Sequence, residues 1–231
     1  MTLTDQQIER YSRQIIVTGI GGLGQERLLA SSAALVGSPE DAADALSYLA
    51  GAGVGRIVLY PVGTPALYLP MAARAAEANP DVRVAVAEEA SAADCALLLA
   101  IIGDRSAAKV AGRLCRDRHA ATTIAARARS SRAAIVARLD VPGRVAILPA
   151  PPPCPVCADA GILEDEVGAR SAKAGVVAMV AVSEALRLLA GDAGQQPHGA
   201  VVEFDGYASR RSEVRRREDA GEPSCACGTA S

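Results

Sequence analysis

The feature that most constrains the fold is a continuous apolar run, Cys95–Ile102, which ends at Gly103. A run without polar alternation is typical of a strand that is buried on both faces of a parallel sheet. Two shorter apolar runs, Ala33–Val36 and Arg56–Tyr60, precede it, with a helical segment, Glu40–Ala50, between them. This order predicts an α/β fold with a Rossmann-like, mostly parallel sheet and helices on both faces.

The other expected elements complete a single domain, for which 231 residues are sufficient. We expect an N-terminal helical extension over 1–32, a Rossmann-like core over 33–148 and a C-terminal part over 149–231, whose last dozen residues look disordered. Further helices are expected at 3–14, 25–31, 71–78, 106–119 and 168–189, and further strands at 82–87, 121–125, 133–139, 144–148 and 201–204.

Charge and hydropathy limit the classes of partner. The formal net charge of −2 gives no broad attraction to nucleic acid, although the segment 210–217 is locally rich in arginine. The polar opening segment lacks the apolar stretch of a signal peptide, and no segment is apolar enough to span a bilayer. We therefore expect a soluble cytoplasmic protein that binds neither nucleic acid nor a membrane.

Two glycine-containing segments compete for the role of a nucleotide-binding loop. The first, Gly19–Gly24, matches G-x-G-x-x-G and precedes a helical segment. The acidic residues that follow at 40–44 lie in a helical segment, whereas a ribose-binding carboxylate should end a strand. The second, Gly37–Ala42, follows the better β–α–β strand but holds one glycine of the pattern, and Pro39 lacks an N–H. We interpret it as a helix start whose acidic residues complement the helix dipole.

The cysteines fall into two groups. Cys154-Pro-Val-Cys157 has the spacing with which two thiolates chelate one zinc ion, and Cys225-Ala-Cys227 is a second close pair. Together they predict a structural zinc site that clips the C-terminal antiparallel strands to the loop before the last long helix. A redox role for Cys154–Cys157 is the weaker alternative. Cys95 and Cys115 lie in apolar patterns and are expected in the core.

Several segments, in the same order along nearly the whole chain, resemble the ThiF, MoeB and HesA proteins, relatives of the ubiquitin-activating enzymes. The segments are Glu9–Leu28 with its Arg-Tyr-Ser-Arg-Gln helix, Ala34–Gly37, Tyr48–Gly55, Asn79-Pro80, Cys154–Cys157, Ala160–Leu163 and Glu184–Gly191. The resemblance assigns Gly19–Gly24 to a turn before the domain and Gly37 to the nucleotide loop.

Members of that family adenylate the C-terminal glycine of a ubiquitin-like sulfur-carrier protein with Mg·ATP, and they dimerise. The resemblance implies that Arg13 reaches the ATP of the partner subunit and that Asp104 stands near the magnesium position. Other family positions depart from the pattern: Pro39 or Glu40 and Ala42 replace loop glycines, and Tyr60 replaces the ribose-binding aspartate. The phosphate-contacting asparagine, arginine and lysine also have no counterparts.

Two hypotheses follow, and the sequence leaves both open. The chain is a divergent enzyme that uses ATP through Arg13 and backbone groups, with Arg56 or Arg74 as substitute cations. Alternatively, it is a noncatalytic partner, in a homodimer or a heterodimer, that donates Arg13 to an intact homologue. The family's ATP site stabilises the charge of the transition state with cations and carboxylates, and this chain lacks several of them. We therefore expect weak or absent adenylation. A nicotinamide-dependent oxidoreductase using Gly19–Gly24 is the third and least favoured hypothesis.

Overall fold

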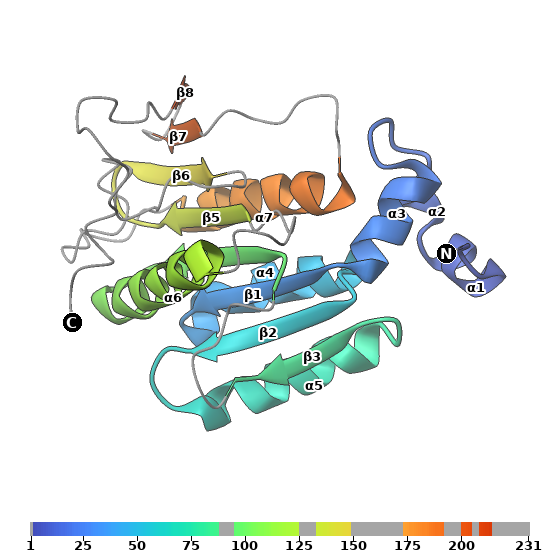
Figure 1. Cartoon of the computed structure of the whole chain (residues 1–231), viewed down its shortest axis with the longest axis horizontal. Helices are drawn as coiled ribbons and strands as arrows, with labels where there is room; N and C mark the ends of the chain where they lie inside the picture. The colour runs from blue at the N-terminus through green and yellow to red at the C-terminus, as the bar shows by residue number, and fades with distance from the viewer. Residues whose placement is uncertain are drawn as a thin grey trace.

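The computed structural model describes residues 2–87, 95–124, 133–148, 173–191, 200–204 and 208–213. Eight strands of this part form one mixed sheet in the order β3-β2-β1-β4-β5-β6-β7-β8 (Figure 1). The strands β3, β2, β1, β4 and β5 are parallel, and β5 to β8 are antiparallel. Their bounds are β1 Ser32–Gly37, β2 Arg56–Pro61, β3 Arg83–Val86, β4 Leu97–Ile102, β5 Ala133–Arg138, β6 Gly143–Leu148, β7 Ala200–Phe204 and β8 Ser209–Glu213.

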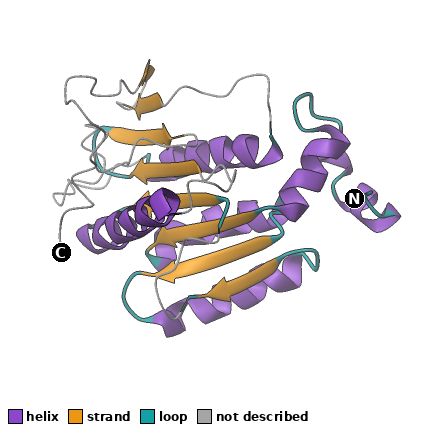
Figure 2. Cartoon of the chain, in the orientation of Figure 1, coloured by secondary structure: helices purple, strands orange, loops and turns teal. Residues whose placement is uncertain are grey.

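Helices cover both faces of the sheet (Figure 2). Helix α6 lies on one face, and α4, α5 and α7 lie on the other. The helices are α1 Asp5–Arg10, α2 Ser12–Ile15, α3 Gly21–Ala30, α4 Pro39–Gly51, α5 Leu69–Ala78, α6 Arg105–Ile124 and α7 Ala174–Ala190, with a 3-10 turn η1 at Pro65–Tyr68. The predicted α/β class with a Rossmann-like sheet is therefore confirmed; the predicted zinc clip falls on residues outside the described ranges.

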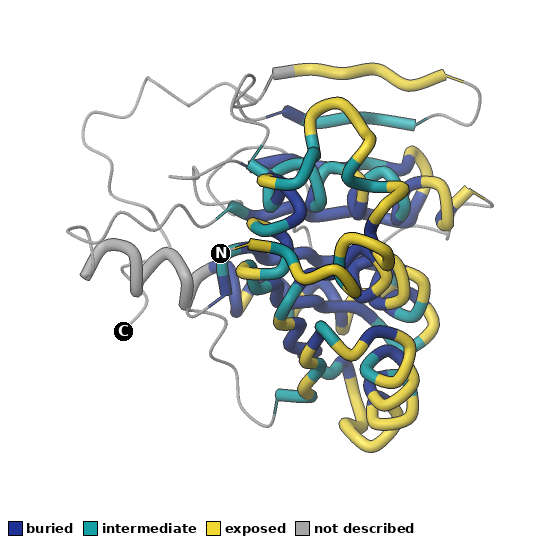
Figure 3. Tube along the Cα trace, turned by 90° about the vertical axis from the view of Figure 1, so that its right-hand side faces the viewer, coloured by how far each residue is buried: buried dark blue, intermediate teal, exposed yellow. Residues whose placement is uncertain are grey.

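The strands fill two separate cores because successive side chains point to opposite faces. Leu97, Leu99 and Ile101 of β4 pack under α4 and α7, whereas Leu98 and Ile102 pack under α6. Every side chain of β4 is buried, as the apolar run predicts. The tube in Figure 3 shows the same buried centre and the exposed outer helix faces.

Short side chains let the helices approach the sheet closely. Ala42 and Ala45 of α4 and Ala178 and Ala181 of α7 are buried at the contact with the strands. This explains how a chain without tryptophan and with one phenylalanine builds a dense core. No helix in the described part combines the length and the apolar character that crossing a membrane requires.

The turn predicted at Gly19–Gly24 is confirmed for Gly19 and Ile20 and is wrong for Gly21–Gly24, which form the first turn of α3. Gly24 packs against the end of α7: a Cβ there would lie 3.2 Å from Ile20 Cγ2 and 3.5 Å from Ala190 Cβ. Arg27 then donates to the carbonyl oxygens of Ala190 at 3.2 Å and Gly191 at 2.8 Å. Gly24 therefore serves helix packing, and the segment precedes the first strand as the resemblance implies.

Three other element predictions need correction. The helix expected at 3–14 is broken at Tyr11, which leaves helical geometry with φ −100° and ψ 12° and buries its side chain in the body of the protein. A strand was expected at 121–125, but residues 121–124 continue α6. The place beside β4 in the sheet is taken by β5. The last long helix begins at Ala174 with Lys173 as its N-cap, and 168–172 lie outside the described residues.

Candidate functional site

The strand order reverses direction at β1, which creates a topological switch point. The chain runs outward from β1 to β2 and β3, and then returns to place β4 on the other side of β1. In open α/β sheets, ligands bind beyond the carboxyl ends of the strands at such a point. Here the switch point lies between Gly37, which ends β1, and the residues Gly103 and Asp104 that follow β4.

The start of α4 occupies one side of the switch point. Ser38 is the N-cap, and its Oγ accepts a hydrogen bond from the Asp41 N–H at 3.2 Å. Pro39, the first helical residue, has no N–H. Gly37 is explained by packing, because a Cβ there would lie 3.1 Å from the Ile101 carbonyl oxygen and 3.4 Å from Ala42 Cβ. The interpretation of 37–42 as a capped helix start, rather than a phosphate loop, agrees with this geometry.

The side chain of Asp41 lies inside the switch point. It is 6% exposed, and the Ser38 hydroxyl donates to its Oδ2 at 2.9 Å. A Cβ at Gly103 would overlap Asp41 Oδ2, so the carboxylate rests directly against the backbone that follows β4. A negative charge thus fills the space between the α4 N-terminus and β4, where a bound phosphate would need positive potential.

Asp104, which the resemblance places near the magnesium position, lies at the same edge. Its Oδ1 accepts from the Ala107 N–H at 2.8 Å, so this carboxylate caps α6. Arg105, the first residue of α6, is exposed beside it. Sequence reasoning missed Arg105 as a cation at this edge, although its place directly after Asp104 was a usable signal.

Tyr60 lies at the neighbouring end of β2, and Tyr68 is the last residue of η1, which follows that strand. Tyr60, at the ribose-aspartate position, is buried among the apolar residues under α6. Tyr68 donates its hydroxyl to the Gly37 carbonyl oxygen at 2.7 Å and accepts from the Val62 N–H at 2.9 Å. Burial raises the pKa of Tyr68; the Val62 hydrogen bond lowers it, and the nearby Asp104 and Asp41 carboxylates raise it further.

A buried ion pair lies one strand further along the same edge. Arg138, at the end of β5, is 1% exposed and binds Asp140 through Nη2 at 2.6 Å and through Nε at 3.2 Å. The strand register places Arg138 beside Ile102, the last residue of β4. This cation was also missed by sequence reasoning, because nothing distinguishes a buried arginine from an exposed one at a strand end. Its guanidinium is already held by a carboxylate.

The predicted substitute cations do not gather at the switch point. Arg56 begins β2 beside Ser32, at the amino edge of the sheet, about 16 Å along the strand from the carboxyl edge. Arg74 is an exposed residue in the middle of α5. Arg13 is exposed in α2, and its helix docks at the amino edge. The structure therefore brings Gly37 and Asp104 together, and it leaves Arg56, Arg74 and Arg13 apart from them.

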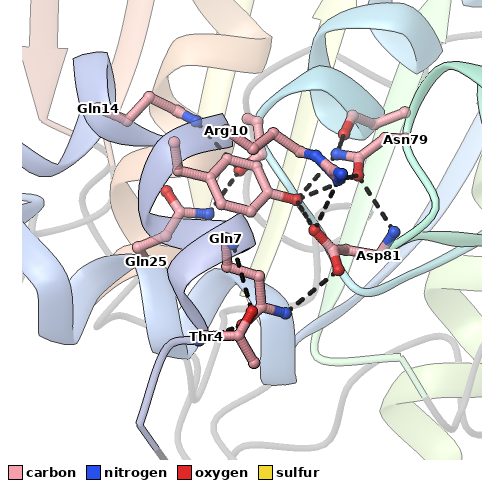
Figure 4. Close-up of polar contacts among 10 residues, drawn as sticks. Thr4, Gln7, Arg10, Gln14, Gln25, Asn79 and Asp81 are labelled. Carbon is pink, nitrogen blue, oxygen red and sulfur yellow. Dashed lines mark hydrogen bonds and ion pairs between the residues drawn. The ribbon is translucent and has the colours of Figure 1, made fainter.

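A hydrogen-bond network docks α1 and α2 at that amino edge (Figure 4). The buried hydroxyl of Tyr11 contacts Asn79 Nδ2 at 2.9 Å and Asp81 Oδ2 at 3.1 Å. The Asp81 carboxylate also accepts from Arg10 Nη1 at 3.1 Å and Gln7 Nε2 at 3.2 Å. Since Asn79 Nδ2 donates to the carbonyl of Ala50 at 2.7 Å, the network joins the N-terminal helices to α4 and β3.

Gly53 makes room for the Tyr11 ring. It has φ +85°, and a Cβ there would lie 2.7 Å from Tyr11 Cζ. Beside it, Gln25 and Gln14 donate to the carbonyl oxygen of Ala52 at 3.0 Å and 3.4 Å. The residues that carry the family resemblance around Tyr11 and Asn79 therefore have a structural role in this chain, which is to hold the segment that carries Arg13.

The four cysteines predicted to bind zinc, Cys154, Cys157, Cys225 and Cys227, lie outside the described residues. Cys95 and Cys115 are buried in the core under α6, as predicted. Within the described ranges, no three His, Cys, Asp or Glu side chains come together as a metal site.

The Tyr11→Phe variant tests the network through its pH dependence. Burial raises the pKa of Tyr11; the Asn79 hydrogen bond lowers it, and the Asp81 carboxylate adds to the rise. The folded state therefore holds the phenolic proton more tightly than the unfolded state, so this contribution to stability is present below pH ~10 and is lost above it.

We expect Tyr11→Phe to lower the free energy of unfolding by about 1–2 kcal/mol at neutral pH. The difference from the unmodified protein should shrink as the pH rises past ~10 in urea unfolding measurements. Tyr48→Phe, at an exposed position, is the control and should have little effect. A difference that grows with pH would contradict this account.

Comparison with known proteins supports the resemblance. No protein-family model matches the chain. It is 44% identical over 59 residues to the SAMP-activating enzyme E1 of Haloferax volcanii, which covers 26% of the chain and 22% of that protein. It is 44% identical over 57 residues to the sulfur carrier protein ThiS adenylyltransferase of Escherichia coli, which covers 25% of the chain and 23% of that protein. The sequence matches thus span less than a quarter of these relatives.

Solved structures extend the likeness to the whole fold. The structure of E. coli MccB with ATP has a TM-score of 0.60 at 13% identity, and the match covers 95% of the chain and 73% of MccB. The structure of PaaA has a TM-score of 0.58 at 15% identity, and the match covers 92% of the chain and 75% of PaaA. The predicted resemblance to the ThiF/MoeB/HesA-type adenylyltransferases is therefore confirmed in sequence over about a quarter of the chain, and the fold is shared with MccB and PaaA over most of it.

Proposed function

We propose that this chain takes part in activating a ubiquitin-like sulfur-carrier protein, and that it does so without adenylating the carrier at its own switch point. The first half rests on the relatives, which are named as adenylyltransferases of sulfur-carrier proteins and as a SAMP-activating enzyme. The second half rests on one observation, which is the buried Asp41 carboxylate between the α4 N-terminus and Gly103.

The residues at the switch point do not fit a triphosphate. A phosphate chain needs backbone N–H donors and cations, because its charge must be compensated at close range. At the start of α4, Pro39 offers no donor and the Asp41 N–H is already directed to Ser38. The Asp41 and Asp104 carboxylates add repulsion, and Arg138 is held by Asp140. Arg105 also lies at this edge, at an exposed position where one arginine contributes little to holding a phosphate chain.

Removing the Asp41 carboxylate should improve nucleotide binding. We expect the isolated chain to bind Mg·ATP too weakly to detect by titration calorimetry, and Asp41→Ala to bring the binding into the detectable range, because a like charge facing the phosphates is lost. Asp44→Ala, which removes an exposed carboxylate from the same helix, is the matched control and should bind no better than the unmodified chain. Tight binding by the unmodified chain would contradict the proposal.

The exposed Arg13 supports a role in trans. Because α2 docks at the amino edge, this arginine lies far from the switch point of its own chain and is available to a second subunit. We propose that the chain pairs with an intact homologue, or with a second copy of itself, and presents Arg13 to the partner's nucleotide site. In a heterodimer with an intact homologue, Arg13 would contact the ATP bound by the homologue, although the nucleotide site of its own chain is depleted.

Coexpression tests this role. An intact homologue purified with this chain should adenylate its carrier faster than when it is purified alone, and Arg13→Ala should remove most of that gain because a cation facing the transition-state charge is lost. Arg74→Ala, at an exposed helical position, is the control and should keep the gain. If Arg13→Ala leaves the partner's rate unchanged, the in-trans role is wrong.

We also propose a structural zinc ion on Cys154, Cys157, Cys225 and Cys227, for which the spacing of the two cysteine pairs is the support. The purified chain should contain about one zinc per chain by elemental analysis. Replacing one cysteine of each pair by serine should remove the zinc and lower the melting temperature, whereas Cys115→Ser should leave the metal content unchanged. A folded, metal-free chain would refute the zinc site.

A further inference from the structure

Strand β8 forms one edge of the sheet, and β3 forms the other. It pairs with β7 on one side, and no strand of the described part pairs with its other side. Ser209, Arg210, Arg211 and Ser212 are all exposed, and Figure 3 shows the strand in yellow beside β7, at the outer edge of the sheet. An edge of this kind carries outward N–H and C=O groups with which an added strand can pair.

The two arginines of β8 differ in their surroundings. Successive residues of a strand point to opposite faces, so Arg210 and Arg211 lie on different sides of the sheet. Arg210 is directly opposite Glu203 of β7, whose carboxylate offsets its charge. Arg211 is directly opposite Val202 and has no acidic residue across from it on that strand. Strand β8 itself holds two arginines and one glutamate, Glu213, so the net positive charge that an added strand would meet is small and is carried mainly by Arg211.

We propose that the outer edge of β8 takes up an extended, acidic segment of a partner protein as an added strand. Backbone hydrogen bonds to β8 provide the attachment, and the arginines select the partner. An uncharged strand gains no ion pair and leaves Arg211 partly desolvated, and a basic strand is repelled, whereas a glutamate beside Arg211 forms a cross-strand ion pair. This surface lies at the far antiparallel end of the sheet, away from the switch point, so the proposal goes beyond the proposed function.

Nucleic acid fits this edge less well. The described residues of β8 include no aromatic side chain on which a base could stack, and the formal net charge of the chain is −2. The first two residues of the basic segment 210–217, Arg210 and Arg211, thus have a proposed role in binding the added strand. The charges of Arg210 and Arg211 disfavour pairing of β8 with uncharged or basic strands, and they favour pairing with acidic strands.

Peptide binding to the full chain tests the proposal. The probe is a fluorescent eight-residue peptide of alternating glutamate and threonine, and its control has glutamine in place of every glutamate. Fluorescence anisotropy should show binding of the glutamate peptide at low salt, at least about fivefold weaker binding of the glutamine peptide, and loss of the difference at high salt. A third peptide, N-methylated at alternate residues, should not bind, because it cannot complete the strand pairing.

Variants at both edges of the sheet separate this site from general charge attraction. Arg211→Gln should weaken binding of the glutamate peptide about fivefold, and Arg210→Gln should weaken it less because Glu203 faces that residue. Arg83→Gln, an exposed arginine on the opposite edge strand β3, should have no effect. Equal losses at Arg83 and Arg211, binding of the N-methylated peptide, or the absence of peptide binding would overturn the proposal. Binding of a single-stranded oligonucleotide that is lost in Arg211→Gln would overturn it in favour of nucleic acid.

Discussion

Burial of both faces of the central strands is the constraint on which the rest of the structure depends. Every side chain of β4 is buried, and β1 is buried over all but its first residue. Helices must then cover both faces, so connections between parallel strands pass through α4, α5 and α6. With the faces occupied by packing, chemistry and recognition are left to the edges of the sheet.

The edges of the sheet have distinct roles. The amino edge holds the N-terminal helices through Tyr11, Asn79 and Asp81, and so presents Arg13 on an anchored segment. The carboxyl edge contains the switch point, where the buried Asp41 carboxylate rests against Gly103. In the proposed function, the anchored segment presents Arg13 to another subunit, and the carboxylates at the switch point disfavour a triphosphate there.

Much of this architecture could be predicted from the sequence, because long apolar runs and β–α–β spacing depend on local pattern. Cys95–Ile102 predicts the central strand, and Gly37–Ala42 predicts a capped helix start; both are seen in the structure. Gly24 was misleading, because a glycine that lets a phosphate approach and a glycine that lets a neighbouring helix approach look the same in a sequence. The Thr-rich end of α6 was also misread, since its β propensity is overridden by the place that β5 takes in the sheet.

The candidate site was predictable in part. Gly37 and Asp104 were assigned to one edge by resemblance, and strand order brings them together. Arg56 was wrongly predicted to lie near the nucleotide site. It begins β2 at the amino end of the strand, whereas the switch point lies at the carboxyl end. The importance of Asp41 depends on its contact with Gly103, which is distant in sequence, and that contact follows from the packing of α4 against β4.

The most direct measurement of the central claim is ATP–pyrophosphate exchange by the purified full chain with a ubiquitin-like carrier protein whose C-terminal glycine is free. An intact relative, such as the E. coli sulfur carrier protein ThiS adenylyltransferase with its own carrier, serves as the positive control. The account predicts exchange at the background level for this chain, because its switch point presents carboxylates to the phosphates. Carrier-dependent exchange at a rate comparable with that of the control would contradict it.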